Sequence, residues 1–328
     1  MRRHAMFAAA LVAGLALAGS GRAEEVLRAT SMLPLGTVYS QSFISFIERV
    51  NMEAAGVVRI NLLGGPEALP TAEQANAVRS GIVDMIYGPS SYYPGDVPET
   101  DAFVGGNVPP AELRENGGMA LLNEIHQQKL NAYLLSHPEG SLGFHIYLTQ
   151  LPVLDAAGLP NLDGLRVRGA QLYREFFMGL GATYVSIKVP EVYTALERGT
   201  VAGIGWPSVG LMDLSWDNFL THRIDPHYFQ GDIVILVNLD RWNAMDEIAR
   251  NALRELGLAH EQRSYAVFTD LGLEEDAEMQ RRGIEVVTLS DAAAKKYRRQ
   301  AYDTAWARLK SRDDTHYEAL RRLFYREE

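Results

Sequence analysis

Arg168 is the residue of this sequence whose side chain is best suited to bind a small anion. It lies near the end of the segment 165–169, which we predict to be a β-strand. A guanidinium presents a planar fork that can donate hydrogen bonds to both oxygens of a carboxylate. Where strands run parallel, ligands bind beyond their carboxyl ends. We therefore expect a binding site built from 168–170, 205–208 and 87–91.

Further polar side chains lie close to these positions. Tyr173 falls in the first turn of a predicted helix, 171–180, and can reach the same site, although its helical spacing favours packing equally well. Ser90, Ser91 and Tyr92 follow another predicted strand and supply hydroxyl groups. We regard these four residues as secondary candidates for ligand contact.

The sequence lacks the motifs that common hydrolases require. It contains neither Gly-x-Ser-x-Gly nor His-Glu-x-x-His. His222 and His227 are five residues apart with a proline between them, so we interpret them as loop residues. There is no cysteine, which excludes a thiol nucleophile, a disulfide framework, a thiolate metal site and a lipid-modified amino-terminal cysteine. We expect a protein that is not an enzyme.

Three stretches share one local pattern, an amphipathic helix that stops at a glycine and is followed by a short apolar strand. Glycine is favoured there because it adopts the left-handed conformation that ends many helices. Together with the strand 165–169, the second and third stretches alternate strand and helix across 165–205, which is typical of a parallel sheet flanked by helices. The predicted helices are 71–80, 171–180 and 190–198, and the strands after them are 82–87, 183–189 and 201–205.

The remaining pattern extends this α/β organisation. A first strand, 26–30, precedes a loop, 31–36, and an amphipathic helix, 38–50. Proline and glycine concentrate in 88–118 and 138–164, where we expect loops and crossings between domains. The later predicted elements are strand 233–237, one long helix 245–282, strand 284–287, and helices 291–309 and 315–326.

The first 23 residues have the order of a secretory signal peptide. Arg2 and Arg3 precede an apolar stretch, 6–17, which is shorter than the roughly 20 residues of a membrane-spanning helix, and small residues follow up to Ala23. We expect cleavage after Ala23, no stable membrane insertion afterwards, and a mature protein free in the periplasm. An uncleaved anchor is the alternative.

The chain is strongly acidic. Its 328 residues carry a formal net charge of −10, and loss of the three arginines in residues 1–23 leaves −13. Such a charge disfavours general attraction to nucleic acid or to anionic lipid. An anionic ligand would have to be held by local cations. About 300 residues make two domains or one large one.

An ordered set of motifs resembles the solute-binding subunits of tripartite ATP-independent periplasmic (TRAP) transporters. The resemblance begins at Asn-Leu-Asp-Gly-Leu-Arg-Val-Arg, residues 161–168, and covers essentially the whole mature chain. The other matching segments, in chain order, are Gly-Gly-Pro-Glu (64–67), Gly-Ile-Val-Asp-Met (81–85), Gly-Leu-Gly-Ala-Thr (179–183), Pro-Glu-Val-Tyr-Thr-Ala-Leu (190–196) and Gly-Thr-Val (199–201).

The resemblance implies a two-lobed α/β periplasmic binding protein fold of the type II-like kind. Each lobe would hold a mixed, mostly parallel sheet flanked by helices, and one long helix would span both lobes. We predict lobe I from 24–142 with 232–265, and lobe II with the C-terminal helices from 143–231 with 266–328. Ligand would bridge the lobes and favour a closed form, which the membrane subunits recognise.

The resemblance also assigns candidate contacts. Arg168 matches the carboxylate-clamping arginine of the family. His145 stands where many members carry a second arginine, in Gly143-Phe144-His145, so it is either a weaker donor or a framework residue. Approximate alignment brings Leu33, Gly88 and Pro89 to positions of polar contacts in other members.

Trp206 corresponds to a tryptophan of the branch that binds 2-oxo acids through a cation. In that branch a glutamate precedes the tryptophan and a glutamine precedes the Gly-x-aromatic stretch, whereas Gly205 and Ser141 stand here. A hard cation needs several oxygen ligands, so we expect no metal and no other cofactor. Trp206 then serves as an apolar wall of the site or as core between the lobes.

The functional hypothesis follows from one strong anion-binding residue, Arg168, beside an apolar wall. We expect a monocarboxylate with an apolar or aromatic body, captured by a monomer and delivered to TRAP membrane subunits. The alternatives are a binding protein for an ATP-driven (ABC) importer or a sensor kinase, and a 2-oxo acid binder that uses a cation.

Overall fold

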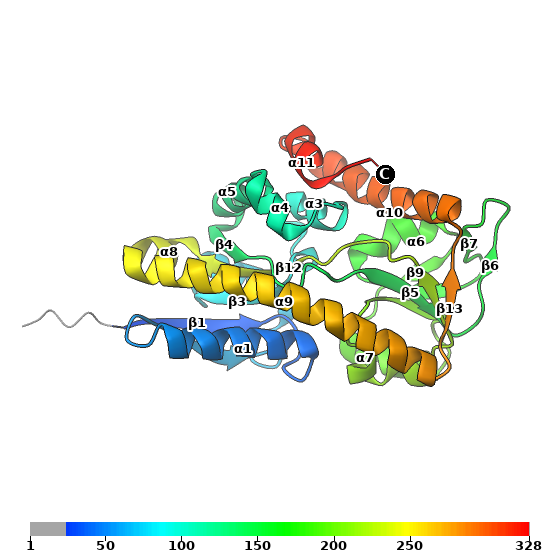
Figure 1. The fold of residues 1–328 in the computed structure, drawn as a ribbon, viewed down its shortest axis with the longest axis horizontal. Coiled ribbons are helices and arrows are strands. Elements are labelled where there is room, and N and C mark those ends of the chain that lie inside the picture. The colour runs from blue at the N-terminus through cyan, green and yellow to red at the C-terminus, as the bar shows by residue number, and fades with distance from the viewer. Residues whose placement is uncertain (1–23, 328) are drawn as a thin grey trace, which may run out of the picture.

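The computed structural model describes residues 24–327, so the predicted signal peptide, 1–23, lies outside the described residues. Two larger β-sheets lie side by side with helices around them (Figure 1). None of the described helices is both long and apolar enough to cross a membrane.

The first sheet has five strands and mixed direction. β1 pairs in parallel with β2 and β3, whereas β12 runs antiparallel to β3 and β4. β12 is buried along its whole length, as its apolar run predicts. In spatial order the strands are β2 (Val58–Gly64), β1 (Glu25–Ser31), β3 (Met85–Pro89), β12 (Ile233–Asn238) and β4 (Ala132–Ser136).

The second sheet has six strands and is also mixed. β8 pairs in parallel with β9 and β10, as predicted, and β11 pairs in parallel with β13, while β5 is antiparallel to both β10 and β11. The spatial order is β13 (Glu285–Thr288), β11 (His222–Asp225), β5 (Phe144–Leu148), β10 (Gly203–Pro207), β8 (Arg166–Arg168) and β9 (Thr183–Val185). A separate pair is formed by β6 (Val153–Leu154) and β7 (Pro160–Asn161).

Helices surround both sheets. The α-helices are α1 (Val38–Glu53), α2 (Thr71–Ser80), α3 (Asp101–Val104), α4 (Pro110–Glu115), α5 (Gly118–Leu130), α6 (Arg174–Gly179), α7 (Val189–Glu197), α8 (Leu239–Ala244), α9 (Glu247–Arg281), α10 (Asp291–Arg312) and α11 (Tyr317–Phe324). Short 3-10 turns are η1 (Ser90–Tyr92), η2 (Pro98–Thr100), η3 (Gln171–Tyr173), η4 (Met212–Leu214) and η5 (Trp216–Asn218).

The glycines predicted to end three helices do so. Gly81 caps α2 with φ 72°, and Gly181 and Gly199 follow the last turns of α6 and α7 with φ 90° and 63°. A side chain at such φ values would clash with its own backbone, which explains the choice of glycine. Other predicted boundaries move: β3 begins at Met85 because the chain is still turning after Gly81, and the segment 171–180 splits into η3 and α6.

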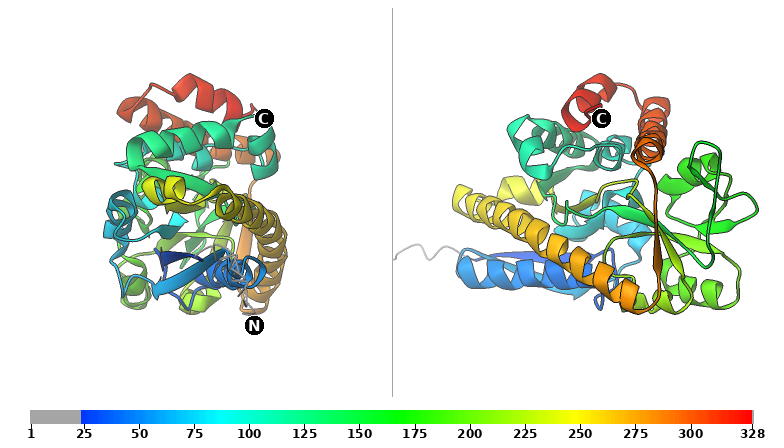
Figure 2. Two further views of the ribbon diagram at one scale, coloured as in Figure 1. Left: turned by 90° about the vertical axis from the view of Figure 1, so that its left-hand side faces the viewer. Right: turned by 45° about the vertical axis from the view of Figure 1, so that its right-hand side comes forward.

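The long helix α9 links the two halves of the molecule. It begins at Glu247, two residues after its predicted start, because Asp246 caps it and α8 occupies the residues before. Figures 1 and 2 show it running past both sheets. Glu261 of α9 accepts a hydrogen bond from the backbone N–H of His137 beyond β4. Glu275 accepts one from the backbone N–H of Gly210 and one from that of Leu211, both beyond β10.

The last two helices pack against elements of both predicted lobes. α10 contacts α3 and α6, whereas α11 contacts α3 and α5, and Figure 1 shows both at one end of the molecule, above the two sheets. The predicted two-lobed α/β fold is confirmed. The exact lobe boundaries, including the grouping of 266–328 with lobe II, remain a prediction.

Candidate functional site

A small cavity lies where strand ends of the two sheets meet. Its volume is about 40 Å³, well below the roughly 300–1,000 Å³ of typical ligand pockets. Binding of a larger molecule therefore requires side chains or lobes to move outward. The lining residues are Leu33, Tyr39, Pro89, Ser91, Tyr92, Leu142, Phe144, Arg168, Ala170, Tyr173, Trp206, Pro207, Gly231, Asp232 and Ile233.

Arg168 is the cation of this cavity. It ends β8 and only 5% of its surface is exposed. Its Nε donates to the carbonyl oxygen of Ile187 at 3.0 Å, and its Nη1 lies 3.5 Å from the carbonyl oxygen of Gly205, which is long for a hydrogen bond. Burial lowers the pKa of Arg168, but a guanidinium remains charged in proteins. Both of these hydrogen-bond partners among the described residues are neutral carbonyl groups, so neither balances the positive charge of Arg168.

Two indole rings surround the guanidinium. Its central carbon is 5.8 Å from the ring centre of Trp206 and 5.9 Å from that of Trp216. The two rings meet edge to face at 4.7 Å, which holds both in place. Within the described part of the chain, the buried Nε1 of Trp206 has no hydrogen-bond acceptor. This wall is therefore aromatic and can still donate one hydrogen bond.

Glycines let aromatic side chains pack behind Arg168. A Cβ added to Gly205 would lie 2.6 Å from Cζ of Phe177 and from the hydroxyl oxygen of Tyr228. A Cβ on Gly169 would come within 2.9 Å of Phe177 and of Tyr173. These residues belong to a cluster of buried aromatic rings, so the apolar core supports this side of the cavity directly.

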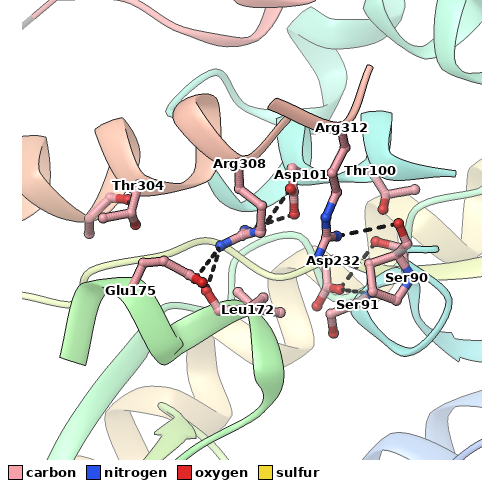
Figure 3. A network of polar contacts seen from close by, with 12 residues as sticks. Ser90, Ser91, Thr100, Asp101, Leu172, Glu175, Asp232, Thr304, Arg308 and Arg312 are labelled. Atoms are coloured by element: carbon pink, nitrogen blue, oxygen red, sulfur yellow. Dashed lines mark hydrogen bonds and ion pairs between the residues drawn. The ribbon is translucent and has the colours of Figure 1, made fainter. Parts of the chain in front are cut away.

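Asp232 is the anion of the cavity. It directly precedes β12 and is 1% exposed. Its Oδ2 accepts hydrogen bonds from the backbone N–H of Ser91 at 2.6 Å and from the hydroxyl of Ser90 at 3.2 Å, as Figure 3 shows. Burial raises the pKa of Asp232, whereas the hydrogen bonds from Ser91 and Ser90 lower it.

The described residues contain no group of three or more His, Asp or Glu side chains placed to hold a metal ion. The cavity itself offers one carboxylate, one guanidinium and several aromatic groups. It can bind a small polar molecule through charge and hydrogen bonds.

The sequence that forms this cavity matches a known protein family. The model of the family "Bacterial extracellular solute-binding protein, family 7" matches residues 30–313. The chain belongs to this family. The match confirms the resemblance to TRAP solute-binding subunits that the sequence motifs indicated.

Individual relatives of this family 7 protein are distant. A solute-binding protein of Albidiferax ferrireducens is 23% identical over 297 residues, covering 85% of each chain. A monocarboxylate 2-oxoacid-binding periplasmic protein of a Nostoc species is 26% identical over 242 residues, 68% of this chain and 63% of its own length.

Solved structures share the fold. A Bordetella pertussis extracytoplasmic solute receptor that binds pyroglutamic acid superposes with a TM-score of 0.76 at 18% identity, covering 91% of this chain and 98% of its own. A TRAP periplasmic solute-binding protein of Rhodoferax ferrireducens with bound malonate gives 0.75 at 20% identity, covering 90% and 96%.

Most of the residues predicted for the site of this family 7 protein meet at the cavity. Arg168, Trp206, Leu33, Pro89 and Tyr173 all line it. So do Ser91 and Tyr92 among the secondary candidates.

Gly88 and Ser90 lie behind the cavity wall instead. A Cβ on Gly88 would come within 2.5 Å of Cβ of Met32, so this position needs a glycine for close packing. Ser90 is buried and directs its hydroxyl to Asp232. Both support the cavity from outside it.

His145 is placed differently from the predicted contact. It lies one residue deeper in β5 than Phe144, which lines the cavity, and adjacent strand residues point to opposite faces. Its Nδ1 is 3.1 Å from the carbonyl oxygen of Ile224 and 3.0 Å from Oδ1 of Asp225. Because its ring is engaged with β11, we leave His145 out of the proposed ligand contacts.

Sequence reasoning missed six cavity residues. Among them, Asp232 and Phe144 lie at the start of strands that run antiparallel to a neighbour, so their amino ends lie beside the carboxyl ends of that neighbour. One feature of the sequence could have indicated Asp232: it is an acidic residue directly before the apolar segment 233–237. The six missed residues are Tyr39, Leu142, Phe144, Gly231, Asp232 and Ile233.

Proposed function

We propose that this protein is the periplasmic solute-binding subunit of a TRAP transporter, and that it captures a monocarboxylate with an apolar or aromatic body and delivers it to the membrane subunits. The main support is the buried guanidinium of Arg168, which is the one cationic group among the described residues that line the cavity, in a wall that is largely aromatic and aliphatic. One guanidinium takes one carboxylate in a bidentate pair.

The composition of the wall supports a ligand with an apolar body. Pockets select their ligands by a few polar groups placed on an apolar surface. Here Tyr92, Phe144, Tyr173 and Trp206 provide that surface. Among residues 24–327, which the structure describes, no second arginine or lysine lines the cavity. A second carboxylate would therefore be buried without a cation, which is costly.

The relatives support a carboxylate ligand and leave the number of carboxylates open. The names of the Nostoc relative and the Bordetella pertussis structure refer to monocarboxylic ligands, whereas the Rhodoferax structure holds malonate, a dicarboxylate. The preference for one carboxylate therefore rests on Arg168 of this chain.

The same cavity supports binding without catalysis. Its polar groups include a guanidinium, a carboxyl group that accepts hydrogen bonds from two serines, and phenols. Among the described residues that line it, no hydrogen-bonded pair of a nucleophile and a histidine base occurs. The proposed role is that of a monomeric receptor. Because the ligand would be held by side chains alone, dialysis against EDTA is expected to leave its affinity unchanged.

Calorimetry on the mature protein, residues 24–328, tests the proposal. The panel pairs benzoate and 3-methyl-2-oxobutanoate with succinate and malonate. We expect the monocarboxylates to bind more tightly, by about tenfold or more, since each uncompensated buried charge costs at least about 1.4 kcal/mol. Tighter binding of succinate or malonate would refute the preference for one carboxylate.

A further inference from the structure

The cavity that holds Arg168 also holds an acidic side chain that the proposed function does not use. Asp232 lines it and is even less exposed than Arg168, 1% against 5%. A carboxylate removed from water to this extent is costly unless hydrogen bonds or a cation compensate it. The two hydrogen bonds that it accepts come from Ser90 and Ser91, which are neutral.

The hydrogen bonds of Asp232 favour an ionised carboxylate with one oxygen to spare. Both bonds end on Oδ2, and the shorter one, from the N–H of Ser91, is 2.6 Å long. Short bonds of this kind are characteristic of charged acceptors. Each carboxylate oxygen can accept two hydrogen bonds, so Oδ1 retains its capacity to accept one from a ligand.

Aromatic side chains line the cavity together with Arg168 and Asp232. Tyr92 and Tyr173 line the same cavity. Burial raises the pKa of Tyr173, and the negative charge of Asp232 raises it further while the positive charge of Arg168 lowers it, so this phenol is within electrostatic reach of both. The lining therefore combines a guanidinium, a carboxyl group and phenol rings.

We propose that Asp232 is a specificity-determining residue, which selects carboxylates whose body carries an N–H donor, either an ammonium or a ring N–H, on the side away from the carboxylate. The inference rests on the proposed function, because it assumes that Arg168 takes the carboxylate. A ligand with both groups matches the two buried charges at once. A pure hydrocarbon body leaves Oδ1 of Asp232 desolvated and unpaired, which costs affinity.

Ligand pairs of one shape with and without the N–H test this selection. Pyrrole-2-carboxylate is compared with furan-2-carboxylate, and L-proline with cyclopentanecarboxylate, by calorimetry on the mature protein. We expect the wild type to bind the N–H member of at least one pair about tenfold or more tightly, the range for a hydrogen bond to a charged group. Asp232→Asn keeps the shape of the side chain but loses its charge. In this variant, the affinities for the two members of a pair should differ by no more than about threefold.

Two variants separate selection from structural support. Ser90→Ala removes one hydrogen bond to Oδ2 of Asp232 and keeps the charge, so it should weaken both members of a pair equally and preserve their ratio. If Asp232→Asn also weakens both members equally, Asp232 merely anchors the loop and the inference is wrong. It is equally wrong if the wild type binds neither N–H member, or binds both members of each pair alike.

The two proposals can fail independently. Arg168→Ala should abolish binding of every probe, with or without an N–H, if the proposed function is correct. Loss of binding in Arg168→Ala together with an unchanged ratio in Asp232→Asn would overturn the role of Asp232 alone. Retained binding in Arg168→Ala would overturn the proposed function.

Discussion

Gly205 shows how a single residue without a side chain maintains the binding cavity. The rings of Phe177 and Tyr228 occupy the space where its Cβ would lie, and the guanidinium of Arg168 is close to its carbonyl oxygen. Any side chain here would collide with the rings of Phe177 and Tyr228, close to Arg168. The packing of the aromatic core and the position of Arg168 therefore both depend on Gly205.

We expect Gly205→Ala to destabilise the protein by about 1–3 kcal/mol, the usual cost of inserting a methyl group into a filled core. Gly95 is the matched control, since nothing lies within 4 Å of a Cβ added there. Gly95→Ala should change the free energy of unfolding by less than about 0.5 kcal/mol. Urea denaturation of both variants measures the difference, and equal effects would contradict this account of the packing.

Glu139 is a buried carboxyl group whose protonation follows from its surroundings. It accepts hydrogen bonds from Ser42 and Tyr87 and is fully buried. Burial raises its pKa to about 8, although those hydrogen bonds oppose the shift. The folded protein thus keeps a proton that the unfolded chain releases near pH 4.3.

The pH dependence of stability should reveal this proton. Since the folded state binds the extra proton, the contribution of Glu139 is largest below about pH 4.3 and is lost as the pH rises to about 8. The free energy of unfolding of the wild type, minus that of Glu139→Gln, should therefore fall between pH 5 and pH 8, by at most about 1.4 kcal/mol per pH unit. Parallel curves in urea titrations at these two pH values would disprove the shift.

At the level of residues, the sequence indicated that Arg168 lies at the cavity but did not indicate Asp232. Arg168 was found because its strand, β8, runs parallel to its neighbours and ends at the cavity. Asp232 directly precedes β12, and the sequence does not reveal that this strand runs antiparallel to β3. In β5 all five residues are buried, so no alternation of polar and apolar residues indicated that Phe144 rather than His145 reaches the cavity.

Helix α10 connects α3 with η3 and α6, which belong to different predicted lobes. Arg308 of this helix donates two hydrogen bonds of 2.8 Å to Asp101 of α3, one of 2.8 Å to the carbonyl oxygen of Leu172, and lies 3.4 Å from Glu175 of α6. Figure 3 shows Arg308 between Asp101 and Glu175. Burial raises the pKa of Asp101, and the charge of Arg308 opposes this shift.

Removal of this arginine should cost far more than removal of an exposed one. Arg308→Ala leaves Asp101 buried without its cation, and we expect a loss of about 3–5 kcal/mol in the free energy of unfolding. Arg299 on the same helix forms an exposed pair with Asp303, so Arg299→Ala should cost less than about 1 kcal/mol. Similar losses in the two variants, measured by urea denaturation, would argue against a role for Arg308 in joining these elements.

At the level of elements, local signals were sufficient for helices and insufficient for sheet order. Glycine after an amphipathic segment marked the ends of α2, α6 and α7 correctly. The start of α9 was misplaced because α8 shares its helical pattern, with only Met245 and Asp246 between them. The mixed direction of both sheets depends on contacts between distant segments, which periodicity does not encode.

At the level of the whole molecule, the residues that line the cavity come from two different sheets. Arg168 and Trp206 come from the second sheet, whereas Pro89 and Asp232 border the first. A ligand that contacts both walls favours the closed arrangement, by as much as it binds that arrangement better than an open one. The family resemblance predicted this architecture because its motifs cover most of the chain. The small size of the cavity could not be predicted from the sequence, because it depends on how aromatic side chains pack in three dimensions.

The most direct test compares two arginines of the same strand. Arg168 is buried at the cavity and Arg166, two residues earlier, is exposed and outside it. With the tightest-binding monocarboxylate of the panel, calorimetry should show a loss of affinity of about 30-fold or more in Arg168→Ala, because removal of one partner of a buried charge pair costs about 2–5 kcal/mol. Arg166→Ala should stay within about threefold of the wild type. Unchanged affinity in Arg168→Ala would contradict the central claim that this guanidinium binds the ligand.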